Sequence, residues 1–212
     1  MIIVGLTGGI ASGKSAIAAM FQEKGAFIID ADKVAHEVIG PNEDAAKEIV
    51  KHFGKDILNP DGVIDREKLA AKVFDDEKAL EKLNSIVHPR VVERFAKTVS
   101  NLKKKKNPPE AVVFDVPLLI EAGMHKMVDT VVVVYVSSEK QKERLQKRNG
   151  FTLEEAEKRL AAQMSPEEKK TYADYIIDNE KSLSETRKQV DEFWSVIPLI
   201  ANKKTKKSKG ET

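Results

Sequence analysis

Met1-Ile2-Ile3-Val4-Gly5-Leu6-Thr7-Gly8-Gly9-Ile10-Ala11-Ser12-Gly13-Lys14-Ser15 is the stretch that decides the fold. Its second half, residues 8–15, matches the pattern G-x-x-x-x-G-K-[ST] of a phosphate-binding loop. An apolar run precedes the loop and residues 15–21 begin as a helix, which is the strand–loop–helix context that the motif needs. The alternative, a glycine-rich turn that merely caps a helix, is disfavoured by this context.

The loop predicts a site for nucleotide phosphates and Mg²⁺. Its glycines let the backbone bend so that successive N–H groups point inward, and the positive end of the following helix adds to the field. Lys14 is expected to reach the β- and γ-phosphates, and Ser15 to hold Mg²⁺ by its hydroxyl. The predicted nucleotide-binding residues are Gly8, Gly9, Ile10, Ala11, Ser12, Gly13, Lys14, Ser15 and Ala16.

Composition restricts the class of protein. The 212 residues are 41% hydrophobic and 33% charged, as in a globular chain with one sizeable core or a core with insertions. Lys and Arg number 36 against 34 Asp and Glu, so a general nucleic-acid binder is not indicated. The absence of cysteine excludes disulfides, thiolate metal sites and cysteine nucleophiles. No apolar run approaches a membrane span and the chain begins with a strand rather than a signal peptide, so we expect a cytoplasmic protein.

Apolar runs separated by helical patterns predict an α/β fold with a parallel sheet. The run at Thr130–Val136 has no polar alternation, which is typical of a strand buried on both faces. The five predicted strands are Ile2–Thr7, Ala26–Ile29, Ala111–Phe114, Thr130–Val136 and Tyr175–Ile177.

Two helical excursions interrupt this order. About 80 residues separate the second and third predicted strands, far more than a crossover needs. Helical spacing there covers Asp32–Ile39, Asp44–Phe53, Asp65–Phe74, Asp76–Val87 and Pro89–Lys106, with a turn at residues 59–62.

The second excursion carries S/T-x-x-E/Q capping boxes starting at Ser138, Thr152 and Ser165, which predict three short polar helices that form a mobile lid. A final helix near Ser184–Ile200 has an apolar stripe in which Trp194 is expected to pack. The predicted organisation is a core of residues 1–32, 107–137 and 173–201, an insert of 33–106, a lid of 138–172 and a disordered Lys-rich tail of 202–212.

Acidic side chains follow two of the predicted strands, at the edge of an open sheet where ligands bind. Asp32, just after the second strand, is suited to accept a hydroxyl proton or to order Mg²⁺, or else to cap the next helix. Asp115 ends the third strand, as a magnesium-associated carboxylate does. Glu121 follows on a loop and either faces the acceptor or is solvated.

Arginines in the predicted lid are candidates for contact with a transferring phosphoryl group. Arg144 and Arg148 lie four apart on one helix face, and such guanidinium groups stabilise charge on a bound triphosphate. A solvated charged helix is the alternative. Arg159 is a weaker candidate because Glu155 is a ready surface partner. The histidines at 36, 52, 88 and 125 have no metal-ligand spacing.

Together these residues resemble the dephospho-CoA kinase family. The matching segments are residues 5–15, Asp30-Ala31-Asp32, Ile86-Val87-His88-Pro89, residues 115–121, residues 144–149, residues 159–164 and residues 173–179, in the order of the family. One departure is Ala11, where the family often has glycine; its methyl group is tolerated if the φ angle there is negative.

The resemblance implies ATP-dependent phosphorylation of the ribose 3′-hydroxyl of dephospho-CoA, with Mg²⁺. It implies a P-loop kinase-like three-layer fold: a parallel five-stranded sheet, a helical acceptor-binding insert and a helical lid. In family terms Asp32 resembles the general base, acting with Lys14, Arg144 and Arg148, of which Arg144 is the first choice to cover the transferring phosphoryl group. The implied metal ligands are Ser15 and Asp115, and the implied substrate-binding residues are Thr7, Asp32, His88, Leu118 and Glu121. The expected partner is the small-molecule substrate, without nucleic acid or membrane, for a monomer or weak homo-oligomer.

Three alternatives stay open. One is another small-molecule kinase of this architecture, such as a nucleoside monophosphate kinase. The insert would distinguish the two, because a CoA precursor is long and needs a roomier helical cap. A GTP-binding switch is disfavoured because Asn202-Lys203-Lys204-Thr205 fails the guanine motif Asn-Lys-x-Asp at its last position. The third is a nucleic-acid protein that uses the Lys-rich tail, against which the near-zero net charge argues.

Overall fold

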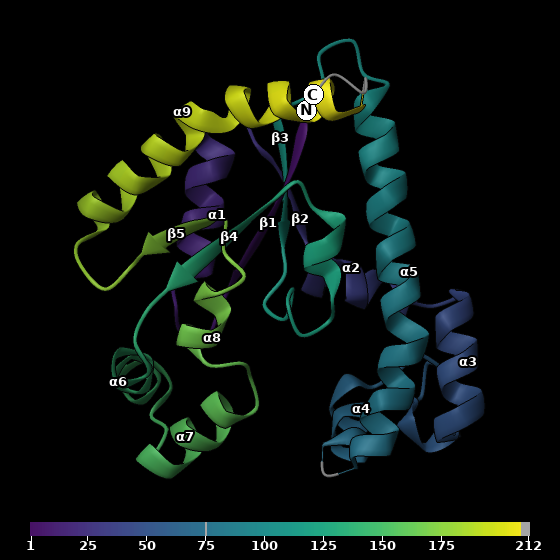
Figure 1. Cartoon of the computed structure of the whole chain (residues 1–212). Helices are drawn as coiled ribbons and strands as arrows, with labels where there is room; N and C mark the ends of the chain where they lie inside the picture. Colours follow the sequence, from purple (N-terminus) through teal and green to yellow (C-terminus); the bar gives the residue numbers. More distant parts are fainter. Residues whose placement is uncertain (75, 209–212) are drawn as a thin grey trace. The chain divides into compact units, whose positions relative to one another are not determined.

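A five-stranded sheet organises the fold of the computed structural model, which describes residues 1–74 and 76–208, with side chains up to residue 202 (Figure 1). The strand order is β2-β3-β1-β4-β5, and β1 pairs in parallel with both β3 and β4. The strands are β1 Ile2–Gly8, β2 Phe27–Asp30, β3 Ala111–Asp115, β4 Thr130–Tyr135 and β5 Tyr175–Asp178. The predicted α/β fold and all five predicted strands are therefore confirmed.

The register brings the functional loops to one edge of the sheet. Leu6 pairs with Asp115 across β1 and β3, and Gly8 pairs with Val134 across β1 and β4. The carboxyl ends of these strands consequently lie side by side, with the phosphate-binding loop leaving the central strand between the other two.

The core of the sheet is closed by α1 (Lys14–Glu23) and α9 (Leu183–Ser208), which pack against each other and against the strands (Figure 1). Phe21 of α1 meets Phe193 edge to face at 5.6 Å between ring centroids, and Trp194 lies 6.3 Å from Phe21. The prediction that Trp194 packs in the core is confirmed.

The chain divides into two compact units. One comprises residues 1–29 with 105–212, and the other is the continuous segment 30–104. The second unit has its own apolar core, built around Ile49, Phe53, Ile57, Leu69 and Ile86. Its helices are α2 Ala31–Val38, α3 Asp44–Phe53, η1 Lys55–Ile57, α4 Arg66–Val73 and α5 Glu77–Lys103.

Helix α5 corrects one prediction. The sequence pattern predicted two helices separated at Pro89, and the structure has one helix that runs through it. Proline removes one backbone donor and disturbs the carbonyls of the preceding turn. The guanidinium of Arg90 donates to the Ile86 carbonyl at 2.7 Å, which adds a side-chain hydrogen bond in the turn that precedes the proline.

The second helical excursion contains α6 (Ser138–Asn149), α7 (Leu153–Ala161) and α8 (Pro166–Lys170). The predicted capping boxes at Thr152 and Ser165 both form. Each hydroxyl accepts the backbone N–H three residues on, and the glutamate at that position accepts the backbone N–H of the cap residue. The predicted box at Ser138 is wrong: Ser137 is the cap residue and makes no side-chain bond, while Gln141 is buried.

The C-terminal segment also differs from expectation. Residues 202–208 were predicted to be disordered, and they continue α9 to Ser208, as lysine's good helix propensity allows. Residues 209–212 of that predicted tail lie outside the described residues. A short 3-10 turn, η2 (Met124–Met127), completes the described elements. Within the described part of the chain, every helix is too short or too polar to cross a bilayer.

Candidate active site

The phosphate-binding loop joins β1 to α1 in a conformation that depends on glycine. Gly13 has a φ angle of 86°, in the left-handed region, and a side chain there would collide with the amide of Asn179. A Cβ at Gly8 would lie 2.7 Å from Ser12 Oγ and 2.8 Å from the carbonyl oxygen of Val134. No side chain caps α1, so its first N–H groups are left to a ligand such as phosphate.

Lys14 and Asp115 form a salt bridge at the base of this loop. Asp115 is buried at the end of β3, and Lys14 reaches it from the first turn of α1. Ser15, the next residue, is exposed, and its hydroxyl has no hydrogen bond to the described residues. The three predicted groups for phosphate and metal thus lie at one edge of the sheet.

This donor set fits a magnesium ion that arrives with a nucleotide. The described residues contain no preformed cluster of three or more His, Asp or Glu side chains for a metal. Mg²⁺ at phosphate sites usually takes one or two protein ligands and completes its shell with phosphate and water. Ser15 and Asp115 supply that number of oxygen donors.

Ala11 occupies a strained position within the loop. Its φ angle is 59°, so the condition under which its methyl group would be tolerated without cost, a negative φ, is not met. A left-handed conformation costs a non-glycine residue roughly 1–2 kcal/mol. The loop keeps this conformation because neighbouring groups hold it.

Two side chains hold the outer side of the loop through its carbonyl oxygens. Arg144 of α6 donates to the carbonyls of Ala11 at 3.1 Å, Ser12 at 3.3 Å and Asn179 at 2.7 Å. Asn179, directly after β5, donates to the Ser12 carbonyl at 2.8 Å, and Thr186 donates to its side-chain oxygen. In this arrangement Arg144 braces the loop rather than extending over it.

Arg148 lies one turn further along α6 from Arg144. It lines a cavity together with Ala11, Gly13, Arg144 and Lys147. Its Nε donates to the side-chain oxygen of Asn149 at 2.9 Å. Arg159 of α7 instead stacks over the ring of Phe151 at 4.3 Å.

The loop after β3 is tied to the base of the lid helices. Thr7, which was predicted to bind substrate, is fully buried and donates to the Pro117 carbonyl at 2.9 Å. Lys169 of α8 is also fully buried and pairs with Glu121 at 2.6 Å. Glu121, which was predicted to bind substrate, further accepts from the Met164 N–H at 3.1 Å, so its carboxylate joins the loop to the base of the lid helices. Leu118 on the same loop is 43% exposed.

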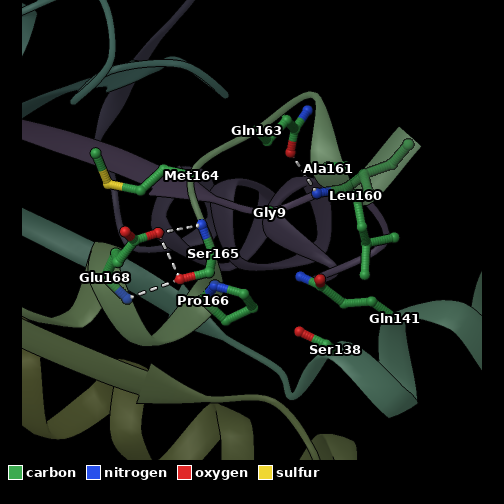
Figure 2. Close-up of a pocket in the computed structure, with 11 residues that line it drawn as sticks. Gly9, Ser138, Gln141, Leu160, Ala161, Gln163, Met164, Ser165, Pro166 and Glu168 are labelled. Atoms are coloured by element: carbon green, nitrogen blue, oxygen red, sulfur yellow. Dashed lines mark hydrogen bonds between the residues drawn. The ribbon is translucent and has the colours of Figure 1, made fainter. Parts of the chain in front are cut away.

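A second cavity lies between the loop and the lid helices (Figure 2). Its lining includes Gly9 and Ile10 of the phosphate-binding loop and Gln141, Leu160 and Gln163 of the second helical excursion. Gln163 Oε1 accepts the Ile10 N–H at 3.0 Å, and a dashed line starts at the Gln163 side chain in Figure 2.

The remaining predicted residues belong to the unit of residues 30–104. Asp30 caps α2 by accepting from the N–H groups of Asp32 and Lys33. Asp32 is therefore not the capping residue, and its exposed carboxylate has no partner among the described residues. His88 lies within α5, not at a helix start as predicted; its side chain is exposed, and partial desolvation by the residues around it lowers its pKa.

Sequence reasoning assigned no role to the side chains of Asn179 and Lys169, and it gave Gln141 only a place in the capping box predicted at Ser138. Asn179 had a usable signal, since it directly follows an apolar strand of a parallel sheet. Lys169 had none, because lysine is almost never fully buried.

The site lies on a strand–loop–helix unit of a parallel α/β sheet, and the loop lysine forms a salt bridge with the carboxylate at the end of a neighbouring strand. These features define a phosphate-loop kinase fold. The family model described as CoaE, dephospho-CoA kinase, matches residues 2–185. The chain belongs to this family.

Individual relatives agree with the family assignment. The chain is 45% identical to a dephospho-CoA kinase of Syntrophus aciditrophicus over 93% of this chain and 83% of that protein. It is 47% identical to one of Geobacillus kaustophilus over 89% of this chain and 93% of that protein. The solved dephospho-CoA kinase of Campylobacter jejuni aligns with a TM-score of 0.69 at 29% identity, over 92% of this chain and 96% of that one.

Proposed function

We propose that this chain transfers the γ-phosphoryl group of ATP to the ribose 3′-hydroxyl of dephospho-CoA, with the following division of roles. The membership in the family and the intact phosphate-binding loop with its Lys14–Asp115 pair carry this proposal. The loop N–H groups and Lys14 hold the phosphates, and Ser15 and Asp115 hold Mg²⁺, which neutralises charge on the phosphates when it is bound.

The adenine end of ATP is proposed to lie by α6. The cavity at Ala11 and Gly13 is flanked by Arg144, Lys147 and Arg148, whose aliphatic stems and guanidinium planes suit a flat base. Arg144 then acts through the loop carbonyls that it braces. Arg148, which bonds its neighbour Asn149 while Arg144 bonds three carbonyls, is the more available of the two for direct contact with nucleotide.

The acceptor is proposed to bind through the unit of residues 30–104, with Asp32 as general base. Its carboxylate is exposed, has no partner among the described residues and follows the end of β2 by two positions. His88 and the exposed Leu118 are proposed to contact the acceptor. Phosphoryl transfer through a loose transition state needs the hydroxyl aimed more than fully deprotonated, which suits an aspartate.

The remaining parts of the proposal concern the setting of the reaction. Residues 138–172 are proposed to act as a lid that excludes water, and residues 33–106 as the acceptor-binding insert. The nearly balanced charge and the lack of cysteine support a cytoplasmic enzyme, monomeric or weakly associated, without nucleic acid.

The test is ADP release with Mg²⁺-ATP across an acceptor panel of dephospho-CoA, AMP, CMP, adenosine and no acceptor. The expected result is turnover with dephospho-CoA alone and CoA as product. Turnover with AMP or CMP would contradict the proposed acceptor but would be consistent with the proposed nucleotide site. ADP release without acceptor would contradict the roles assigned to Asp32 and to the lid.

A further inference from the structure

The cavity of Figure 2 contains a contact that the proposed reaction does not use. Ile10 is the third residue of the phosphate-binding loop, and its N–H is a backbone donor of that loop. The acceptor is Gln163 Oε1, 153 residues later, in the segment that returns from α7 to α8. A neutral carboxamide therefore accepts a hydrogen bond from a backbone N–H of the phosphate-binding loop, although such N–H groups normally bind anions.

The segment that carries Gln163 is anchored immediately beyond it. Met164 donates its N–H to Glu121, and the buried Lys169 pairs with Glu121 and donates to the Pro117 carbonyl at 3.3 Å. On its other side lies α7, which contacts α6 rather than the sheet. Gln163 is thus the link between an anchored base and the outer lid helices.

A phosphate oxygen competes favourably with a carboxamide for such a donor. Hydrogen bonds with a charged partner are roughly twice as strong as neutral ones. We propose that Gln163 is a positioning residue that occupies the Ile10 N–H and yields it to a phosphate oxygen of the incoming nucleotide, which releases the lid segment. This inference rests on the proposed nucleotide site but not on the identity of the acceptor.

The same cavity offers the released carboxamide a new partner. Gln141 is 2% exposed, and its Nε2 is buried with no hydrogen-bond partner in the described part of the chain. A buried donor without an acceptor is costly, so an arrangement that satisfies it is favoured. Gln141 and Gln163 line one cavity, and Gln141 lies against Gly9 of the loop. Transfer of Gln163 Oε1 from the Ile10 N–H to Gln141 Nε2 would keep the carboxamide bonded.

The test is the sign of a change in affinity, measured by calorimetry on the full chain without acceptor. The ligands are inorganic tripolyphosphate and the β,γ-imido analogue of ATP. Gln163→Ala removes the competitor, so both ligands should bind about 2- to 10-fold more tightly, the equivalent of one hydrogen bond. Gln146→Ala is the matched control: it is the same change on an exposed lid residue, and both affinities should stay unchanged.

Weaker binding in Gln163→Ala would mean that the contact persists in the complex and would overturn the proposal, as would unchanged affinity. Gln141→Met removes the alternative partner and should weaken binding, but only while Gln163 is present. Equal effects of Gln141→Met with and without Gln163 would contradict the transfer between the two amides. A further readout is amide exchange of residues 160–163, which tripolyphosphate should accelerate in the parent chain and leave unchanged in Gln163→Ala. Because no acceptor is used, failure of the proposed acceptor chemistry leaves this test intact.

Discussion

Individual residues of the phosphate-binding loop are held by groups from far along the chain. Ala11 adopts a φ angle of 59°, which is strained for alanine. Arg144 stabilises this conformation by donating a hydrogen bond to the Ala11 carbonyl. Because glycine adopts this conformation without steric cost, replacing Ala11 by glycine can raise the free energy of unfolding.

Ala11→Gly is therefore expected to stabilise the protein. Relief of the left-handed strain, about 1–2 kcal/mol, exceeds the added entropy of the unfolded chain, about 0.5–1 kcal/mol. The measurement is denaturant unfolding followed by fluorescence of Trp194, the one tryptophan, which packs against Phe21. Ala19→Gly, an exposed position inside α1, should instead lose about 1 kcal/mol. A destabilised Ala11→Gly would contradict the strain argument.

Asp32 tests the chemistry at the same scale. Asp32→Asn keeps the shape of the side chain and removes its ability to accept a proton, so turnover should fall about a hundredfold or more. Affinity for ATP should survive, because Asp32 lies outside the unit that carries the phosphate-binding loop. Steady-state kinetics together with nucleotide calorimetry check both points. Unchanged turnover would remove Asp32 from the mechanism.

At the scale of elements, α8 is fastened to the loop after β3 by Lys169 and Glu121, and the two ends of this pair differ in exposure. The Lys169 side chain is 0% exposed and that of Glu121 is 24% exposed. Loss of either partner leaves the other without its counter-charge, and the cost depends on whether water can reach the one that remains.

Glu121→Ala is expected to destabilise the protein more than Lys169→Met. The first change leaves a buried ammonium unpaired, at about 3–5 kcal/mol, whereas the second leaves a carboxylate that water reaches. Denaturant unfolding of the two single variants and the double variant checks the order. A double variant that loses less than the sum would establish the coupling. A greater loss in Lys169→Met would contradict the exposure argument.

The capping boxes give α8 a dependence on pH. The Ser165 side chain and backbone lower the pKa of Glu168 from its usual 4.5. Since the folded pKa is depressed, this contribution is present above pH 4.5 and is lost as the pH falls through the lowered value. NMR titration of the Glu168 carboxyl should give a midpoint below 4.5, and Ser165→Ala should raise it. A midpoint that Ser165→Ala leaves in place would contradict the assignment.

Elements that are determined by a short stretch of sequence could be predicted, whereas those that depend on contacts between distant residues could not. The β1–loop–α1 unit and the boxes at Thr152 and Ser165 are local patterns, and all of them form. The continuity of α5 through Pro89 was not predicted, because proline usually ends a helix, and the bond from the Arg90 side chain to the Ile86 carbonyl is not visible in the local pattern. The contact of Gln163 with Ile10 spans 153 residues and leaves no mark in either segment.

At the scale of the whole molecule, the two units have separate cores and separate proposed ligands. We expect the β,γ-imido analogue of ATP to slow amide exchange in residues 8–16, and dephospho-CoA alone to slow it within residues 30–104. Hydrogen–deuterium exchange of the full chain with each ligand separately checks this division. Protection of residues 8–16 by dephospho-CoA alone would contradict it.

The bond from Asn179 to the Ser12 carbonyl has a consequence for biosynthesis. The loop emerges from the ribosome first, but the asparagine that braces it is translated 167 residues later. Synthesis proceeds at about 5–20 residues per second, so for about 10–30 s a nascent chain carries the phosphate-binding motif without its brace. A chain truncated before β5 therefore exposes a recognisable motif yet lacks the support that makes it an ATP site. Premature termination should yield inert fragments rather than ones that waste ATP.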